Sequence, residues 1–365
     1  MDPEQVVAFR LARHGLATRS ASTLAQAAAC PASDFSRGSA LLALAARTDA
    51  VTREGYDRAV DAGELWVGPS LRAAIHAQDP ADAARFGPAL VAADDDELAE
   101  QLGTGAQRHL AQAGIAAGEA LAEVTDATRQ ALARGRALTK DELHEELRAR
   151  VRDALLPWCK GCASHHVSPM IWRYAGVQAG VRYDAARRMR LGPRDRRTRA
   201  PAADAARAFL RWYGPATVKD LARWAGLARA QAARLWDTLA DELAEVQVDG
   251  ARGSLLREDE GELRSPPQSR GVRLLPPRDP YLQHPDRSAV TTDAAVRKRL
   301  FRPVGGPGAV LQDGRLAGLW RVRARGRRAE LEVEALGRVD RDDLEAEAAR
   351  VAALRGAEGA DVRWT

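Results

Sequence analysis

Residues 202–248 read AADAARAFLRWYGPATVKDLARWAGLARAQAARLWDTLADELAEVQV, and their pattern decides the fold class. The part up to Tyr213 favours a helix, which Gly214-Pro215 ends. Thr217 is placed to cap a short second helix, and Gly226 separates that helix from a longer third one. The stretch closes on strand-like Val-Gln-Val. This order of elements predicts a helix-turn-helix unit with a wing.

The same order recurs toward the N-terminus. Predicted helices within residues 3–62 precede strand-like residues 64–76, and Thr139-Lys140-Asp141-Glu142 has the pattern of a capping box before another helix. We therefore predict a first winged-helix unit with a candidate active-site loop over 1–90, a helical connector over 91–117, and further winged-helix units over 118–192 and 193–262.

The pattern changes after residue 262. Prolines and short apolar runs replace the helical pattern, and Asp313-Gly314 is a typical turn between two strands. A helix is expected over 340–355. We predict a small β-barrel with a C-terminal helix over 263–365. The fold class is α+β, with tandem winged-helix units followed by a small C-terminal β-barrel.

The charge balance favours a polyanionic partner. The 365 residues carry a net charge of +5, and all but four of the 55 basic residues are arginine. Because arginine is also abundant in chains with GC-rich coding, the places where arginines cluster are more informative than their number. Three cysteines do not describe a disulfide framework, and the chain has no long apolar run and no secretory signal. We expect a cytoplasmic protein without membrane contact.

Several stretches, in order along the chain, resemble motifs of the AlkZ-like family of alkylpurine DNA glycosylases. These stretches are RAAIH at 72–76, YGPAT at 213–217 with WAGL at 224–227, LLPPRDPYL at 274–282 followed by Asp286-Arg287, and Asp313-Gly314 with Gly318 and Trp320. The resemblance implies three winged-helix units and a β-barrel around duplex DNA. It also implies hydrolysis of the N-glycosidic bond of N7-alkylated guanine without a metal.

Catalytic members of this family carry a Gln-x-Gln or Gln-x-Asp motif in the loop after the second helix, where it positions a water. The corresponding loop here, 31–38, contains Ser33 and Asp34 but no glutamine. Asp34, with Ser33 beside it, is therefore the catalytic candidate, since a carboxylate can orient water and stabilise positive charge on the sugar. The alternative is that Ser33 or Asp34 only caps the next helix.

Arg72 and His76 are candidates for holding a DNA phosphate or lining a base pocket, although Ala73 replaces the family glycine between them. The alternative is an exposed wing arginine and a core histidine. Other predicted DNA contacts lie in basic runs and on the helices of the third unit, where Trp224 and Trp236 are expected in the core. These candidates are Arg187, Arg188, Arg190, Arg194, Arg196, Arg197, Arg229, Arg234, Arg323 and Arg325. Their alternatives are a solvated linker and a plain exposed strand edge.

Cys159-Lys160-Gly161-Cys162, followed by His165 and His166, could supply zinc ligands. Structural zinc sites usually draw a second ligand pair from a distant segment, and the flanking Pro157 and Trp158 suggest a buried turn. The sequence therefore favours packed free thiols, and we expect no metal or other cofactor.

Two functions follow from these patterns. The first is a monofunctional DNA glycosylase acting on N7-alkylated purines in double-stranded DNA, as a monomer. The second is a catalytically inactive winged-helix DNA-binding protein or transcriptional regulator, which the missing glutamines favour.

Overall fold

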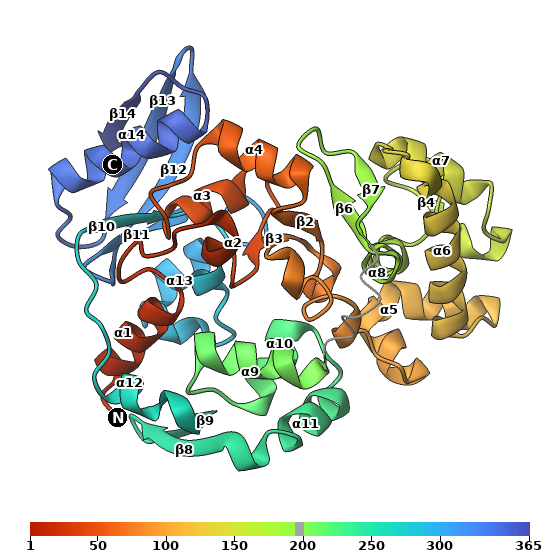
Figure 1. Ribbon diagram of the computed structural model, residues 1–365, viewed down its shortest axis with the longest axis horizontal. Helices are drawn as coiled ribbons and strands as arrows, with labels where there is room; N and C mark the ends of the chain where they lie inside the picture. Colours follow the sequence, from red (N-terminus) through yellow and green to blue (C-terminus); the bar gives the residue numbers. More distant parts are fainter. Residues whose placement is uncertain (194–200) are drawn as a thin grey trace. The chain divides into compact units, whose positions relative to one another are not determined.

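The computed structural model describes residues 1–193 and 201–365, which form a mixed α/β fold with two compact units (Figure 1). The first unit joins residues 1–56, 207–220 and 239–365, and the second joins residues 57–206 and 221–238. The chain therefore passes repeatedly between the units, and segments distant in sequence complete each one. The division of the chain into five segments stays a prediction.

The helices and strands of the first unit come from all of its segments. Its helices are α1 (Pro3–Arg13), α2 (Leu24–Ala27), α3 (Ser39–Ala45), α12 (Glu260–Arg264), α13 (Ala294–Leu300) and α14 (Arg341–Leu354). Its strands are β1 (Ala32–Ser33), β8 (Leu243–Val248), β9 (Ala251–Leu256), β10 (Val272–Leu275), β11 (Gly308–Gln312), β12 (Arg315–Arg325), β13 (Arg328–Ala335) and β14 (Ala360–Trp364). Three helices contribute residues to both units, namely α4 (Arg53–Ala62), α9 (Ala202–Tyr213) and α10 (Val218–Ala225).

The C-terminal strands form one sheet in the order β10-β11-β12-β13-β14 (Figure 1). The first four strands are antiparallel neighbours, whereas β14 returns parallel to β13 after α14. Within the described residues the sheet is open, so the β-barrel expected from the sequence is not confirmed. The physical reason is α14, which contacts both outer strands, β10 and β14, and buries Leu344, Val351 and Leu354. A helix thus covers apolar surface that closure of the sheet would otherwise bury.

The hairpin predicted at Asp313-Gly314 is confirmed. These two residues join Gln312 of β11 to Arg315 of β12, which are paired across the hairpin. Asp313 has φ 50° and Gly314 has φ 80°, as a type I′ turn requires. The carboxylate of Asp313 also accepts a hydrogen bond from the Gly271 backbone N–H at 2.8 Å.

A buried ion pair lies in the core of the first unit. Arg47 donates from both terminal guanidinium nitrogens to the two carboxylate oxygens of Asp279, each at 2.8 Å. The Tyr213 hydroxyl donates to the Pro280 carbonyl at 2.7 Å, and His14 meets the Tyr213 ring edge-on at a centroid distance of 4.9 Å. Residues of the YGPAT and LLPPRDPYL stretches therefore pack together, although more than 50 residues separate them in sequence.

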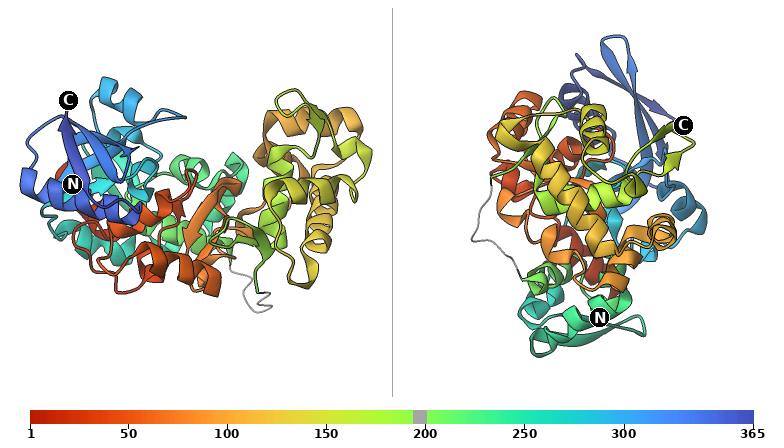
Figure 2. Two further views of the ribbon diagram at one scale, coloured as in Figure 1. Left: turned by 90° about the horizontal axis from the view of Figure 1, so that it is seen from above. Right: turned by 90° about the vertical axis from the view of Figure 1, so that its right-hand side faces the viewer.

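The second unit is mainly helical. Its elements are β2 (Trp66–Pro69), β3 (Ile75–Gln78), α5 (Asp95–Ala113), α6 (Ala117–Ala131), α7 (Lys140–Arg148), β4 (Trp158–Cys159), β5 (Ser164–His165), α8 (Pro169–Ala179), β6 (Val181–Tyr183), β7 (Met189–Leu191) and α11 (Arg229–Asp237). Helices α5, α6 and α8 contact one another around buried Leu121, Val124 and Ile171 (Figure 2). The predicted capping box at Thr139 and Glu142 is present at the start of α7.

The elements expected within 202–248 are also found. Helices α9, α10 and α11 are followed by the antiparallel hairpin of β8 and β9, although α11 ends at Asp237 and is shorter than predicted. Across residues 1–193 and 201–365, none of the helices combines the length and apolar character needed to cross a bilayer.

Candidate functional site

The loop at 31–38 places Asp34 just before α3. Asp34 is 3% exposed, and its Oδ1 accepts hydrogen bonds from the backbone N–H groups of Gly38 at 3.1 Å and Ala40 at 3.0 Å. Ser33 is also buried, and its carbonyl accepts from the Ser39 hydroxyl at 2.9 Å. The N-cap residue of α3 is Gly38, so Asp34 is not itself the helix cap given as the alternative, but its carboxylate fixes the backbone at the start of α3. Its catalytic role stays a prediction.

His76 and Arg72 belong to the hairpin region of the second unit. His76, on β3, is 1% exposed, and its Nδ1 bonds the Ala74 carbonyl at 3.0 Å. Burial, reinforced by Arg72, lowers the pKa of His76 to about 3, so the ring is neutral at pH 7. Arg72 donates to the Trp224 carbonyl near the end of α10. Both side chains have packing roles here, and the DNA contacts predicted for them stay predictions.

The basic run after α8 is held partly by its own hairpin. Arg187 has its guanidinium 5.7 Å from the centroid of the Tyr183 ring, and Arg190 pairs with Asp184 at 3.2 Å. Arg188 is exposed and donates to the Ala137 carbonyl at 2.6 Å. The remaining candidates of this run lie outside the described residues, namely Arg194, Arg196 and Arg197.

The other predicted DNA contacts are exposed, and most of them face an acid. Arg229 is the first residue of α11, and Arg234 on the same helix pairs with Glu97 at 2.6 Å. On β12, Arg323 and Arg325 lie on one side of the strand and reach acids of β13, each at 3.4 Å; these acids are Glu332 and Glu330. Both arginines are therefore exposed on this strand, together with compensating charge.

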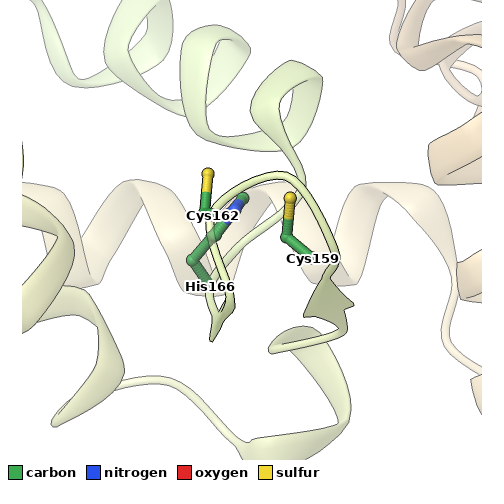
Figure 3. Close-up of side chains that lie close together, drawn as sticks. All are labelled: Cys159, Cys162 and His166. Carbon is green, nitrogen blue, oxygen red and sulfur yellow. The ribbon is translucent and has the colours of Figure 1, made fainter.

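The cysteine and histidine segment forms a small hairpin in the second unit. The ligand atoms of Cys159, Cys162 and His166 lie within 4.8 Å of one another, and Figure 3 shows the two sulfur atoms beside the His166 ring. The backbone N–H of Cys162 and the His166 ring lower the pKa of Cys159 to about 7. His165 is not part of this group, since its Nδ1 bonds the Leu156 carbonyl at 2.8 Å. The turn is not buried as expected, because Trp158 is 56% exposed.

Comparison with known proteins identifies the family. The family model described as "DNA glycosylase AlkZ-like" matches residues 24–354. This chain belongs to the AlkZ-like DNA glycosylase family.

Two relatives come from Streptomyces sahachiroi. The chain is 34% identical over 122 residues to its interstrand DNA cross-link repair glycosylase, a match that covers 32% of this chain and 33% of the relative. The match thus spans about a third of that curated relative. A solved structure of the Streptomyces sahachiroi DNA glycosylase AlkZ has the same fold, with a TM-score of 0.78 and 24% identity over all of both chains.

Sequence reasoning missed a cavity in the first unit of this AlkZ-like chain. The cavity, of about 800 Å³, is lined by Arg10, Tyr281 and His284 among others. Burial lowers the pKa of Arg10 to about 10, and its guanidinium donates to the carbonyls of Gly214 and Pro215. Tyr281 lies in the LLPPRDPYL stretch, so the sequence motif could have indicated it. Arg10 gave no local signal, because its partners are more than 200 residues away.

Proposed function

We propose that this protein is a monofunctional DNA glycosylase that hydrolyses the N-glycosidic bond of N7-alkylated purines in double-stranded DNA. The observation that carries the proposal is the family match over residues 24–354. The proposal includes three winged-helix units. Each unit would use one antiparallel hairpin as its wing, namely β2–β3, β6–β7 or β8–β9, and each hairpin follows helices in the chain.

The chemistry requires little from the protein at the leaving group. An N7-alkylated purine already carries positive charge, so its departure needs little help from an acid. What remains is to position a water and stabilise charge developing on the sugar, which one fixed carboxylate can do. We assign this role to Asp34, held by the backbone of α3, with Ser33 beside it.

The arginines can exchange their present partners for DNA phosphates. The guanidinium groups of Arg234, Arg323 and Arg325 are exposed and can reach a phosphate, whereas their partners Glu97, Glu332 and Glu330 are largely covered. A phosphate contact therefore has to offset the loss of each ion pair. Phosphate contacts of this kind give affinity that falls with salt. Arg229, at the start of α11, is a further contact in this proposal.

A second function is a catalytically inactive DNA-binding protein or regulator that acts without base release. Two observations favour it: the loop 31–38 contains no glutamine, and the Asp34 carboxylate is already bonded to the backbone at the start of α3.

Release of N7-methylguanine from methylated duplex DNA separates the two functions. We expect release by the wild type and a loss on the order of 10²–10⁴-fold in Asp34→Asn. The Oδ1 of asparagine can accept the same two backbone hydrogen bonds, so this variant removes the charge while keeping the contacts at the start of α3. Asp49→Asn is the matched control, because it neutralises an exposed carboxylate of the same unit that pairs with Arg350.

Each outcome decides between the hypotheses. Release by the wild type and by Asp49→Asn, but not by Asp34→Asn, supports the assignment. Equal release by all three proteins keeps the glycosylase and removes Asp34 from its mechanism. Binding of the duplex without release by any of them supports the inactive DNA-binding protein.

A further inference from the structure

We propose that Cys159, Cys162 and His166 bind a zinc(II) ion in the second unit, with His144 of α7 as the fourth ligand. The observed cluster supplies two thiol groups and one imidazole, and His144 would complete a donor set that suits a structural zinc site.

A short hairpin brings the first three donors together. Cys159 ends β4, Cys162 lies in the turn, and His166 directly follows β5. Their ligand atoms already lie within 4.8 Å of one another. Tetrahedral zinc with bonds of about 2.3 Å to sulfur places its sulfur ligands about 3.8 Å apart, so the side chains have to move by only about 1 Å.

The His166 ring is in the form that a metal requires. Its Nδ1 lies 2.8 Å from the Val167 carbonyl. Because a carbonyl can only accept, Nδ1 is the donor in this contact, which leaves Nε2 as the ligand atom of the ring. Nε2 is buried, and the ring acts on the neighbouring Cys159 thiol. In Figure 3 the sulfur atoms of Cys159 and Cys162 lie near the His166 ring.

His144 supplies a ligand from a distant segment, which the sequence did not reveal. Its ring packs edge-on against His166 at a centroid distance of 5.5 Å and lies 4.9 Å from the Trp172 ring. The His144 Nε2 is likewise buried, and within residues 1–193 and 201–365 no group accepts or donates a hydrogen bond to it. His144 is not within 4.8 Å of all three donors, so its ring has to turn toward the cluster to complete the site.

The segment 157–166 also lacks an apolar anchor of its own. Trp158 is 56% exposed and residues 160–163 are exposed, whereas the buried apolar residues nearest in sequence, Leu156 and Val167, flank the segment. Packing alone thus contributes little to holding this turn. Metal coordination would supply the missing constraint, since the free energy of binding adds to that of folding.

The test measures metal in the full-length chain, independently of any DNA activity. Protein purified under reducing conditions from zinc-supplemented medium is analysed by mass spectrometry of its metals. We expect about one zinc per chain in the wild type and a loss of roughly 10-fold or more in Cys159→Ser and His166→Ala. His165→Ala is the matched control, because it removes the adjacent imidazole, whose Nδ1 is occupied by Leu156, and is expected to keep the metal.

A second measurement keeps the proposal testable if a variant unfolds. Cobalt(II) added to metal-free wild type should produce a thiolate-to-metal absorption band, which zinc then displaces. The band should be weakened or shifted in His144→Ala; an unchanged band would remove His144 from the ligand set and support a site completed by another group. The proposal is overturned if His165→Ala and His166→Ala lose metal equally. It is also overturned if the reduced wild type binds neither ion.

Discussion

His76 and His284 are buried histidines, one in each compact unit, and their surroundings determine their charge. Burial lowers the pKa of each ring to about 3, with Arg72 acting in the same direction on His76 and Arg10 on His284. Both rings are therefore neutral in the folded protein at pH 7, whereas an unfolded histidine has a pKa of about 6.5. Between about pH 3 and pH 6.5, the unfolded state therefore binds protons at these two histidines that the folded state does not bind.

This difference predicts that the protein loses stability as the pH falls from about 7 to 5. In that range the unfolded state binds more protons, so the free energy of unfolding rises with pH, by up to about 1.4 kcal/mol per pH unit for each such histidine. His76→Asn, which can keep the bond to the Ala74 carbonyl, should make the dependence shallower. Urea unfolding at several pH values measures it. An unchanged slope would mean that His76 takes up protons in the folded state.

Single-residue roles could be predicted where the partners are close in sequence. The capping box of Thr139 involves residues within three positions, and local pattern sufficed to predict it; Asp34 likewise bonds residues within six positions at the start of the next helix. The pairing of Arg47 with Asp279 spans 232 residues and left no local signal. His144 escaped notice for the same reason, since its contact with His166 depends on how α7 packs.

The packing between strands β11 and β12 depends on a glycine at position 308. Gly308 is paired with Trp320 across the sheet, and the Trp320 Nε1 donates to the Leu275 carbonyl of β10 at 2.8 Å. A Cβ built at Gly308 would overlap both the indole and that carbonyl. The absence of a side chain thus lets a buried tryptophan bridge three strands.

Gly308→Ala should destabilise this sheet by about 1–3 kcal/mol, the usual cost of overpacking. The tryptophan has to move, and its hydrogen bond to Leu275 then weakens. Chemical unfolding gives the energy, and the emission of the buried tryptophan should change in the folded protein. Gly337→Ala is the control, because a Cβ there meets no atom within 4 Å. Equal stability of both variants would contradict this account.

Individual helices and turns could be predicted from the sequence, whereas the pairing of the strands could not. The turn at Asp313-Gly314 and the helix near the C-terminus follow from local residue types, so their prediction succeeded. Whether the strands close into a barrel depends on where β14 returns, and periodicity carries no information on that pairing. The open sheet therefore had to be observed.

At the scale of the molecule, residues 207–238 are shared between the two units. Residues 207–220 belong to the first unit, where Phe209 is fully buried, and residues 221–238 belong to the second, where Trp224 packs edge-on against Phe86 at 6.1 Å. The family and the mixed α/β fold could be predicted from motifs spread along the chain. The division into these units could not, because it depends on contacts between distant segments.

Trp224→Ala is expected to destabilise the second unit, and Phe209→Ala is expected to destabilise the first. Each removes a buried aromatic side chain, at a cost of about 3–5 kcal/mol. Amide hydrogen exchange should accelerate in α5, α6 and α8 for Trp224→Ala and in β10–β13 for Phe209→Ala, because local opening follows cooperative units. Equal acceleration in both sets by either variant would show that the chain opens as one unit.

The passage of the chain between units has a consequence during synthesis. Residues 1–56 leave the ribosome first, yet their unit is complete only when residues 239–365 have followed. At roughly 5–20 residues per second, that delay lasts tens of seconds. The second unit can finish earlier, once residue 238 has emerged. The nascent N-terminal helices thus spend this interval with apolar faces uncovered, which makes them the part of the newborn chain most in need of chaperone protection.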